Sequence, residues 1–457
     1  MEKFIGREYE LSLIQTALKN PSAAIMIYGK RKVGKTTLIK HALKASNTTF
    51  VYYECLATSL SDNVKGFTNE LVRTGVLPFP LGFSSFSEIF AYLSTLNRPL
   101  NIVIDEYPYL KIMTVPEVVD SQFQNIIDES LNNIRLFISG SHISMMKDML
   151  AEKNALYGRF TLIIQLKELD YIKSAEFYPR KSVYDKVAFY SVFGGSPFIN
   201  EFIDDNKSLK ENIVSTILNP SNPVSNYAEH LLLSDYTNAV NAERILFAIS
   251  NGRKKYGEIE NLLDMKNNGL LSKQLATLLD MEIIGKSCPI NRPDDKKKMY
   301  YEVFDNLLRF YYAFVYKNKS ALTMLGSNAF YDEYIEKALV TFISHRFEEI
   351  CRTYFSILIR QGKLRGVKNI GTYYYDDSIT RTNGEFDVVL KLSESYDIYE
   401  VKYYNSVLDE KELLLEAEKI NNVKGLPLGK IGFISACGFA SKSDKFELID
   451  GEMIYNI

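Results

Sequence analysis

Four residues near the start of the chain have the types and the spacing that bind phosphate groups. Gly29, Gly34, Lys35 and Thr36 match the pattern G-x-x-x-x-G-K-[ST]. The glycines let backbone N–H groups approach phosphate oxygens, Lys35 can reach the β- and γ-phosphates, and Thr36 can hold Mg²⁺. The predicted nucleotide-binding loop comprises Gly29, Lys30, Arg31, Lys32, Val33, Gly34, Lys35, Thr36 and Thr37.

Such a loop must join a strand to a helix, and the flanking sequence predicts both elements. The apolar run Ala23–Tyr28 reads as a buried strand that leads into the loop. Residues Thr37–Ala45 read as a helix whose positive N-terminal end faces the same anions. The order strand, glycine-rich loop and helix favours ATP and Mg²⁺ as ligands.

A second pair of chemically able residues follows another apolar run. Residues 99–104 predict a buried strand that ends in Asp105 and Glu106. In phosphoryl-transfer sites the first acid holds the Mg²⁺ shell, and the second orients or deprotonates the attacking water. We assign these roles to Asp105 and Glu106. The segment between Lys35 and Asp105 leaves room for one more strand and helix.

A third predicted strand ends in small polar residues. Residues 134–138 are followed by Ser139, Gly140 and Ser141, which belong to the sheet edge where ligands collect in open α/β folds. Either serine could contact the γ-phosphate, and we select Ser139. A plain turn is the alternative interpretation. A further strand is expected at 161–166.

Several of these features together resemble archaeal-type ATPases of the AAA-related switch clade. The segment Phe4–Leu11 resembles the F-x-G-R-E-x-E-L box that precedes the loop in that family, and Tyr157-Gly158-Arg159 resembles its arginine motif. The resemblance implies that Arg159 answers the γ-phosphate, in its own subunit or across a subunit boundary. A helical stretch is expected from about 168 to 193, and the resemblance implies a helical lid in which Pro197 packs against the adenine. From the residues alone, Gly-Ser-Pro is only a turn or a helix start.

Composition limits the remaining function classes. The 457 residues imply two to four domains, and the net charge of −2 argues against a general polyanion binder. Any contact with DNA must therefore use local patches. The four cysteines are widely spaced, which favours a reducing cytoplasm. No run of 18 apolar residues predicts a membrane span, so we expect no membrane partner.

The middle of the chain predicts three short helices and a hairpin. The helices are expected at 242–250, 257–263 and 271–279, and the strands at 283–288 and 299–303, with a polar tip at 291–298. This order resembles a winged helix, a helix-turn-helix variant. The third helix would then enter a DNA major groove and Lys296–Lys298 would touch phosphates. The alternative is a winged helix that packs only within the molecule.

The last 120 residues carry a second group of acids. Asp387 lies on one predicted strand, and Glu400 and Lys402 alternate on the next, so they point to one face. Two carboxylates could hold Mg²⁺, and Lys402 could orient the attacking water near a scissile phosphate. A solvated strand face is the alternative.

This second group resembles the PD-(D/E)xK nuclease superfamily. The expected order is a helix at 335–359, the two strands, a helix at 409–420 and a strand at 430–435. The resemblance assigns Glu348 as an accessory acid of the metal site. Phe386 stands where the superfamily has proline.

We therefore predict an α/β protein with four parts. These are a doubly wound P-loop ATPase core at 1–165, a helical lid at 166–235, a winged helix at 236–320 and a nuclease-like α/β domain at 321–457. The predicted function is an ATP-hydrolysing switch that couples nucleotide state to a DNA-associated, nuclease-like domain, in the cytoplasm and with oligomerisation open. The alternative is a nucleotide-gated DNA- or protein-binding regulator with a degenerate nuclease fold.

Overall fold

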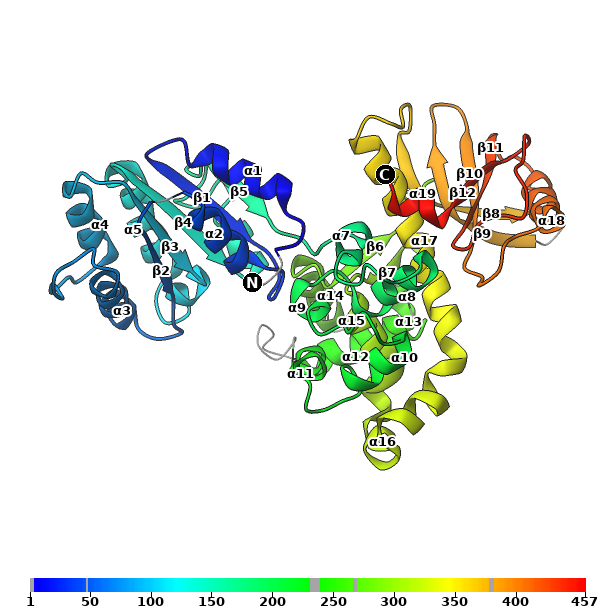
Figure 1. Ribbon diagram of the computed structural model, residues 1–457, viewed down its shortest axis with the longest axis horizontal. Helices are drawn as coiled ribbons and strands as arrows, with labels where there is room; N and C mark the ends of the chain where they lie inside the picture. Colours follow the sequence, from blue (N-terminus) through cyan, green and yellow to red (C-terminus); the bar gives the residue numbers. More distant parts are fainter. Residues whose placement is uncertain (1–3, 47, 231–238, 253, 266–268, 378–381) are drawn as a thin grey trace. The chain divides into compact units, whose positions relative to one another are not determined.

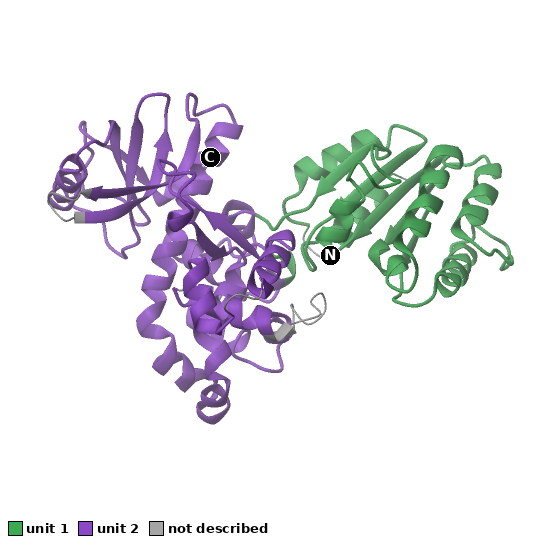
Figure 2. Ribbon diagram, turned by 180° about the vertical axis from the view of Figure 1, so that it is seen from behind, with its two compact units in different colours: residues 1–169, 196–198 green, residues 170–195, 199–457 purple. Residues whose placement is uncertain are grey.

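The chain forms two compact units. A computed structural model describes residues 4–46, 48–230, 239–252, 254–265, 269–377 and 382–457. The first unit comprises residues 1–169 and 196–198, and the second comprises residues 170–195 and 199–457 (Figure 2). The short segment 196–198 therefore belongs to the first unit although both of its neighbours along the chain belong to the second.

The first unit is built on a five-stranded sheet in which every neighbouring pair is parallel. The strand order is β2-β3-β4-β1-β5, with β1 Ala23–Tyr28, β2 Phe50–Glu54, β3 Leu100–Asp105, β4 Ile134–Gly140 and β5 Leu162–Gln165. Figure 1 shows this sheet between its helices. The helices are α1 Glu8–Ala17, α2 Lys35–Lys44, α3 Leu60–Arg73, α4 Phe86–Thr95, the short 3₁₀ helix η1 Tyr107–Lys111, α5 Pro116–Glu129 and α6 Ile143–Asp148.

Helices cover both faces of this sheet because its central strands are apolar on both sides. Alternate residues of β1 enter different cores: Met26 packs in one cluster, and Ile25 and Ile27 in the other. All six residues of β1 and of β3 are buried. This confirms the predicted doubly wound α/β core, since parallel sheets need both faces covered.

The second unit begins with short helices. They are α7 Tyr171–Ala175, α8 Val183–Phe193, α10 Leu209–Ser215 and α11 Pro223–His230, while α9 Pro197–Asn200 begins in the first unit and ends in the second. The helical stretch expected from 168 to 193 is interrupted, because Pro179 cannot continue a helix. Helix α8 starts afresh at Ser182, whose side chain accepts the backbone N–H of Asp185.

Three helices and a two-stranded antiparallel hairpin follow in the expected order. They are α12 Ala239–Ser250, α13 Tyr256–Leu263, α14 Leu270–Asp280, β6 Ile284–Ser287 and β7 Tyr300–Val303, with the 3₁₀ turn η2 Lys296–Lys298 between the strands. We call residues 284–304 the hairpin. Helical segments then lead to the C-terminal sheet, namely α15 Asn306–Phe310, η3 Tyr311–Val315, η4 Tyr316–Asn318, α16 Lys319–Tyr334 and α17 Glu336–Arg360.

The C-terminal sheet has five strands in the order β12-β11-β10-β9-β8. Pairs β8–β9 and β9–β10 are antiparallel, whereas β10–β11 and β11–β12 are parallel. The elements are β8 Asn369–Asp377, β9 Thr382–Lys391, β10 Tyr396–Lys402, α18 Glu410–Asn421, β11 Leu428–Ser435, β12 Glu447–Asp450 and α19 Gly451–Tyr455. A mixed-sheet α/β domain is therefore present, with helices and strands in the expected order.

Two further findings concern the whole described chain. The four cysteines are all free, and Cys55 and Cys351 are buried. None of the helices within the described ranges combines the length and the apolar character that a membrane crossing requires.

Candidate functional site

The loop between β1 and α2 has a backbone that needs its two glycines. A Cβ at Gly29 would lie 2.1 Å from the carbonyl oxygen of Leu166, which is too close for any side chain. Gly34 has a φ of 93°, in the region that L side chains rarely adopt. Neither position can take another residue without moving the loop, so the backbone can wrap an anion at the N-terminus of α2.

Lys35 is held over this loop. Its side chain is buried, and Nζ donates to the carbonyl oxygens of Gly29 at 2.9 Å and Lys30 at 3.0 Å. These contacts place the ammonium group inside the curve of the loop. The loop residues around it differ in exposure: Val33 is buried, whereas Lys32 and Thr37 are exposed. The ammonium group is therefore already at the place where a phosphate would enter.

Asp105 lies at the centre of a hydrogen-bond network at the carboxyl ends of three strands. Its carboxylate accepts from Thr36 Oγ1 at 3.0 Å and from Ser139 Oγ at 2.5 Å. It also accepts from the hydroxyl of Tyr52 and from the backbone N–H of Glu106. Burial, followed by the charge of Asp105, raises the pKa of Tyr52, so the phenol stays a neutral donor. Thr36 and Asp105 therefore meet, as a shared Mg²⁺ shell requires.

Glu106 is oriented by the neighbouring strand. Its backbone is left-handed, with a φ of 49°, which is uncommon outside glycine. Its Oε2 accepts from the backbone N–H of Ser141 at 3.1 Å and from the Ser141 hydroxyl at 2.8 Å. Ser139 is thus a partner of Asp105, and Ser141 is a partner of Glu106. The structure assigns the two serines to different acids.

Two segments that are distant in sequence hold the loop in place. Arg7 donates from Nη2 to the carbonyl oxygens of Val33 at 3.0 Å and Lys167 at 2.6 Å. On the other side, Ser196 donates to the carbonyl oxygen of Lys32 at 3.1 Å. Pro197 lies 3.8 Å from where a Cβ of Gly34 would stand. The predicted adenine contact, Pro197, is therefore beside the phosphate loop.

Arg159 lies at the opposite edge of the same sheet. It precedes β5, and Thr161 pairs with Ala24 at the start of β1, whereas the phosphate loop follows the end of β1. The six residues of β1 separate the two edges by roughly 20 Å. Arg159 instead forms an ion pair of 3.0 Å with Asp128. Within one chain it is too far from the loop to touch the γ-phosphate.

Sequence reasoning missed three residues of this site, namely Arg7, Tyr52 and Ser141 in its contact with Glu106. Arg7 lies in the Phe4–Leu11 motif, but the motif alone does not indicate that its side chain holds the phosphate loop. Tyr52 had no sequence signal, because only the strand order places β2 next to β3. The Ser141 contact depends on β4 lying beside β3.

The predicted C-terminal acids lie on three adjoining elements. The ladder between β9 and β10 ends at the pair Val388–Tyr399, and the next residues of the two strands are Asp387 and Glu400. Glu348 lies on α17. Lys402 pairs with Glu400 at 2.8 Å and with Glu416 at 3.4 Å. Glu416, on α18, was not predicted as part of the group.

These acids influence one another without forming a ready metal site. Burial raises the pKa of Asp387 to about 7, and the charges of Glu348, Glu385 and Glu400 add to the effect. A hydrogen bond to Glu348 raises the pKa of His345. Across the ranges that the structure describes, no three His, Cys, Asp or Glu side chains are grouped so that they could hold a metal ion. The C-terminal metal assignment therefore stays a prediction.

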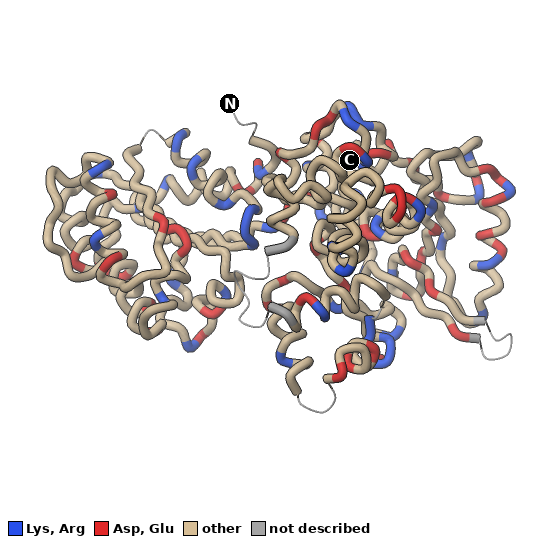
Figure 3. The backbone as a smooth tube through the Cα atoms, turned by 90° about the horizontal axis from the view of Figure 1, so that it is seen from below, with Lys and Arg blue, Asp and Glu red and all other residues tan. Residues whose placement is uncertain are grey.

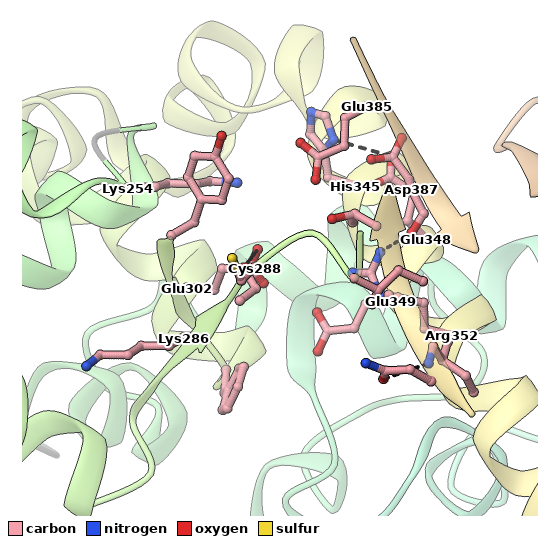
Figure 4. Close-up of a pocket in the computed structure, with 18 residues that line it drawn as sticks. Lys254, Lys286, Cys288, Glu302, His345, Glu348, Glu349, Arg352, Glu385 and Asp387 are labelled. Atoms are coloured by element: carbon pink, nitrogen blue, oxygen red, sulfur yellow. Dashed lines mark hydrogen bonds and ion pairs between the residues drawn. The ribbon is translucent and has the colours of Figure 1, made fainter. Parts of the chain in front are cut away.

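Asp387 and Glu348 line a pocket of about 590 Å³ within the second unit (Figure 4). One wall comes from α17 and strands β8 and β9, and the other comes from the hairpin and Lys254. Its charged or titratable residues are Lys254, Lys286, Glu302, His345, Glu348, Glu349, Arg352, Glu385 and Asp387. Glu400 and Lys402 are not among the lining residues.

The hairpin is attached to the C-terminal sheet. The backbone N–H of Ile290 donates to the carbonyl oxygen of Thr372 at 2.8 Å. Asn291 and Tyr374 exchange two hydrogen bonds, at 2.8 and 3.1 Å, and Lys298 Nζ lies 3.5 Å from the centre of the Tyr374 ring. These contacts involve the predicted DNA-binding tip in packing within the unit, although Lys296 and Lys297 stay exposed.

The predicted recognition helix carries little positive charge. The exposed residues of α14 are Ser272, Lys273, Ala276 and Asp280. Figure 3 shows both signs of charge interspersed along the chain. A phosphate-binding face needs a concentration of Lys and Arg, so α14 offers a weak electrostatic footprint for DNA.

The chain matches two protein families and a curated relative. Residues 4–199 match a family described as an ATPase domain predominantly from Archaea. Residues 311–418 match a family described as Archaea bacterial proteins of unknown function. A curated relative, the uncharacterized protein MJECL04 of Methanocaldococcus jannaschii, is 30% identical over 366 residues, which are 79% of each protein.

Solved structures also match the chain, at low sequence identity. The Walker-type ATPase paby2304 of Pyrococcus abyssi is 19% identical, with a TM-score of 0.51 over 68% of this chain and 96% of that one. The ORC2 protein of Aeropyrum pernix is 14% identical, with a TM-score of 0.46 over 68% of this chain and 94% of that one. The family match, the loop and the network around Asp105 together make the first unit a nucleotide-binding P-loop ATPase domain.

Proposed function

The chain belongs to the same protein family as MJECL04 of Methanocaldococcus jannaschii, and from that premise we propose that it is an ATP-hydrolysing switch whose nucleotide state controls the C-terminal domain. The observation that carries the proposal is the contact between the segment 196–198 and the phosphate loop. This segment belongs to the ATPase unit, while the chain on both sides of it belongs to the other unit.

Each residue of the ATPase site has a part in hydrolysis. Lys35 binds the β- and γ-phosphates, and the backbone N–H groups of the loop bind the same oxygens. Mg²⁺, when bound, neutralises phosphate charge, and Thr36 and Asp105 are the residues that would hold it. Glu106 accepts the proton of the attacking water, and Ser141 holds its carboxylate in place.

Arg159 acts across a subunit boundary in this proposal. Its position at the far edge of the sheet excludes the loop of its own chain, but leaves it able to face the loop of a second copy. Its ion pair with the half-exposed Asp128 would be exchanged for a γ-phosphate contact on assembly. An arginine supplied in this way makes turnover depend on the oligomer.

The coupling follows from chain connectivity. Lys32 accepts a hydrogen bond from Ser196, and its ammonium group lies 4.5 Å from the centre of the Phe198 ring. A change in the loop on binding or hydrolysis moves these residues, and the movement passes along the chain into α8 and α9. Lid closure around a nucleotide is a common switch of this kind. Pro197 would pack against the adenine.

The output of the switch is a metal-dependent nuclease in the preferred version. The element order around the mixed sheet, together with Glu348, Asp387 and Glu400, supports this assignment. DNA is the expected partner, through this domain and the predicted winged helix, and the cytoplasm is the expected location. A second candidate is a nucleotide-gated regulator without cleavage. It is favoured by the ion pairs of Lys402, which engage that residue with Glu400 and Glu416.

A cleavage assay separates the two versions. Purified full-length protein is incubated with plasmid and with single-stranded DNA and RNA, with ATP and either Mg²⁺ or Mn²⁺. The nuclease version expects cleavage that Asp387→Ala and Lys402→Ala abolish, while Lys363→Ala, an exposed lysine of the same domain, retains it. An uncut substrate in every condition would overturn the nuclease version and leave the regulator.

A further inference from the structure

The C-terminal pocket has an acidic wall and a wall of mixed charge. Acidic residues of α17 and β9 form one side, where Glu348, Glu385 and Asp387 lie close together in Figure 4. The opposite side carries Lys254 and Glu302, whereas the Lys286 side chain points away from the acids, toward the ring of Tyr301. Arg352 stands at the foot of the acidic wall, where its Nη1 donates to the carbonyl oxygen of Asp387 at 2.6 Å. The pocket thus offers cations and carboxylates across one space.

An aromatic ring completes the wall that carries Lys254. Phe304, which follows β7, lines the pocket and is 48% exposed. Its ring lies on the backbone of Gly285, because a Cβ at that position would stand only 1.8 Å from the ring's Cζ. The absence of a side chain at Gly285 therefore allows the Phe304 ring to pack directly against the backbone. A half-exposed phenyl ring supported from beneath is a stacking surface for a flat, apolar partner.

The size of the pocket limits what can enter. A volume of about 590 Å³ suits a ligand the size of one or two nucleotides. The hairpin closes one side, since Ile290 and Asn291 are hydrogen-bonded to the edge strand β8. A paired segment of duplex would have to displace the hairpin from β8, whereas an unpaired strand would not.

We propose that this pocket receives single-stranded nucleic acid and brings its backbone to the acidic wall. One base stacks on Phe304, and an adjoining phosphate faces Lys254. Stacking on an aromatic ring together with cations along the backbone is the usual means of binding unpaired strands. The proposal rests on the nuclease-like function proposed above for Asp387 and Glu348, and adds the class of substrate.

Binding without cleavage tests the substrate class. Full-length protein is titrated in EDTA against a fluorescent twelve-nucleotide single strand, as DNA and as RNA, and against the blunt duplex of the same sequence. The expected result is at least about 10-fold tighter binding of a single strand than of the duplex. Equal affinities, tighter duplex binding, or no binding of any oligonucleotide would overturn the proposal.

Variants of the ring test the site itself. Phe304→Ala should weaken single-strand binding about 10-fold, and Phe304→Tyr, which keeps the ring, should not. Phe79→Ala removes an exposed ring of the other unit and is the matched control. Thermal unfolding of each variant shows whether it is folded, and the tyrosine variant keeps the test decisive if the alanine variant is not. Unchanged binding by a folded Phe304→Ala would contradict the proposal.

Lys254 provides a separate readout. Lys254→Ala should lower the slope of log affinity against log salt by about 0.7, which corresponds to one phosphate contact on a single strand. An unchanged slope would show that Lys254 does not face the backbone.

The outcomes also separate this inference from the proposed function. Single-strand binding that depends on Phe304, without any cleavage in Mg²⁺ or Mn²⁺, would support the substrate class and overturn the nuclease. Plasmid cleavage that depends on Asp387, with no effect of Phe304→Ala on binding or cleavage of single strands, would do the reverse.

Discussion

The ATPase site and the C-terminal acidic site of this chain differ in how completely the protein's own hydrogen bonds assemble them. In the first, the acid at the end of β3 already accepts four hydrogen bonds, and Lys35 is already inside the loop. In the second, the charges of the acids raise the pKa of Asp387, which is about 7. Among the described residues, no three acids of this site are grouped so that they could hold a metal ion. One site is organised by the protein; the other contains unbalanced negative charge.

The difference follows from the groups that surround the central acid of each site. Thr36, Tyr52 and Ser139 surround Asp105 with neutral hydroxyl groups, which stabilise a carboxylate without repelling it. The charges of Glu348, Glu385 and Glu400 act against the Asp387 carboxylate, and the charge of Arg352 partly offsets them. A carboxylate in such surroundings stays partly protonated until a cation arrives. The two sites should therefore respond differently to mutation and to pH.

The largest effect is expected at the assembled site. Lys35→Ala removes the ammonium group that binds the β- and γ-phosphates, so ATP turnover should fall below detection. Phosphate release by purified protein measures the effect. Lys44→Ala, an exposed lysine on the same helix α2, should leave turnover unchanged. Turnover that survived Lys35→Ala would show that the lysine does not have this role and that the first site is not assembled for hydrolysis as described.

The next effect tests whether the assembled site is complete within one chain. Arg159→Ala should lower turnover about 10³-fold if, as proposed, the arginine stabilises charge on the transferred phosphoryl group. If it acts in a second copy, mixing inactive Lys35→Ala with inactive Arg159→Ala should restore turnover. In such a mixture, an intact loop can meet an intact arginine.

Concentration dependence checks the same point. If Arg159 acts in a second copy, wild-type turnover per chain should rise with protein concentration, because only the assembled form would be active. Full activity of Arg159→Ala, or a mixture that stays inactive, would show that the site is completed in another way.

The smallest effect belongs to the C-terminal acids. The folded-state pKa of Asp387 is about 7, above its usual 3.8, so the folded protein binds the proton more tightly than the unfolded chain. The stability contributed by this carboxyl is present below pH 4 and is lost as the pH rises toward 7. Asp387→Asn should remove this loss, making the variant more stable at pH 8 by on the order of 2 kcal/mol.

Chemical denaturation in EDTA at pH 5 and pH 8 measures this prediction. Asp444→Asn, at an exposed position of the same unit, is the control and should not change the pH dependence. Mg²⁺ should reduce the advantage of Asp387→Asn if the wild-type acids bind the ion. A variant less stable than the wild type at pH 8 would mean that the carboxylate is well compensated, as at Asp105.

Much of the fold could be predicted from the sequence, for reasons that are local. The strand Ala23–Tyr28 was predicted with the bounds it has in the structure, because a short apolar run before a glycine-rich loop has few other interpretations. The three middle helices lie within one to three residues of their expected starts. The prediction of one helical stretch from 168 to 193 is wrong, because Pro179 cannot continue a helix and α8 begins only at Val183.

The contacts that complete each site could not be predicted from the sequence, because they join elements that are distant along the chain. Tyr52 reaches Asp105 because β2 pairs with β3, and Glu416 reaches Lys402 because α18 lies beside the sheet. Neither pairing has a motif of its own. Such contacts depend on strand order and helix packing, which apolar patterns restrict without specifying.

The sequence by itself determined the phosphate loop, since Gly29, Gly34, Lys35 and Thr36 are contiguous and their backbone requirements are met within a few residues. It also determined the order of helices and strands around the second group of acids. Only the tertiary structure decided that Arg159 lies across the sheet from its own loop and that Ser141 holds Glu106. It alone placed Phe304 on Gly285 opposite Asp387. These relations join residues separated by tens to hundreds of positions, and packing rather than local propensity brings such residues together.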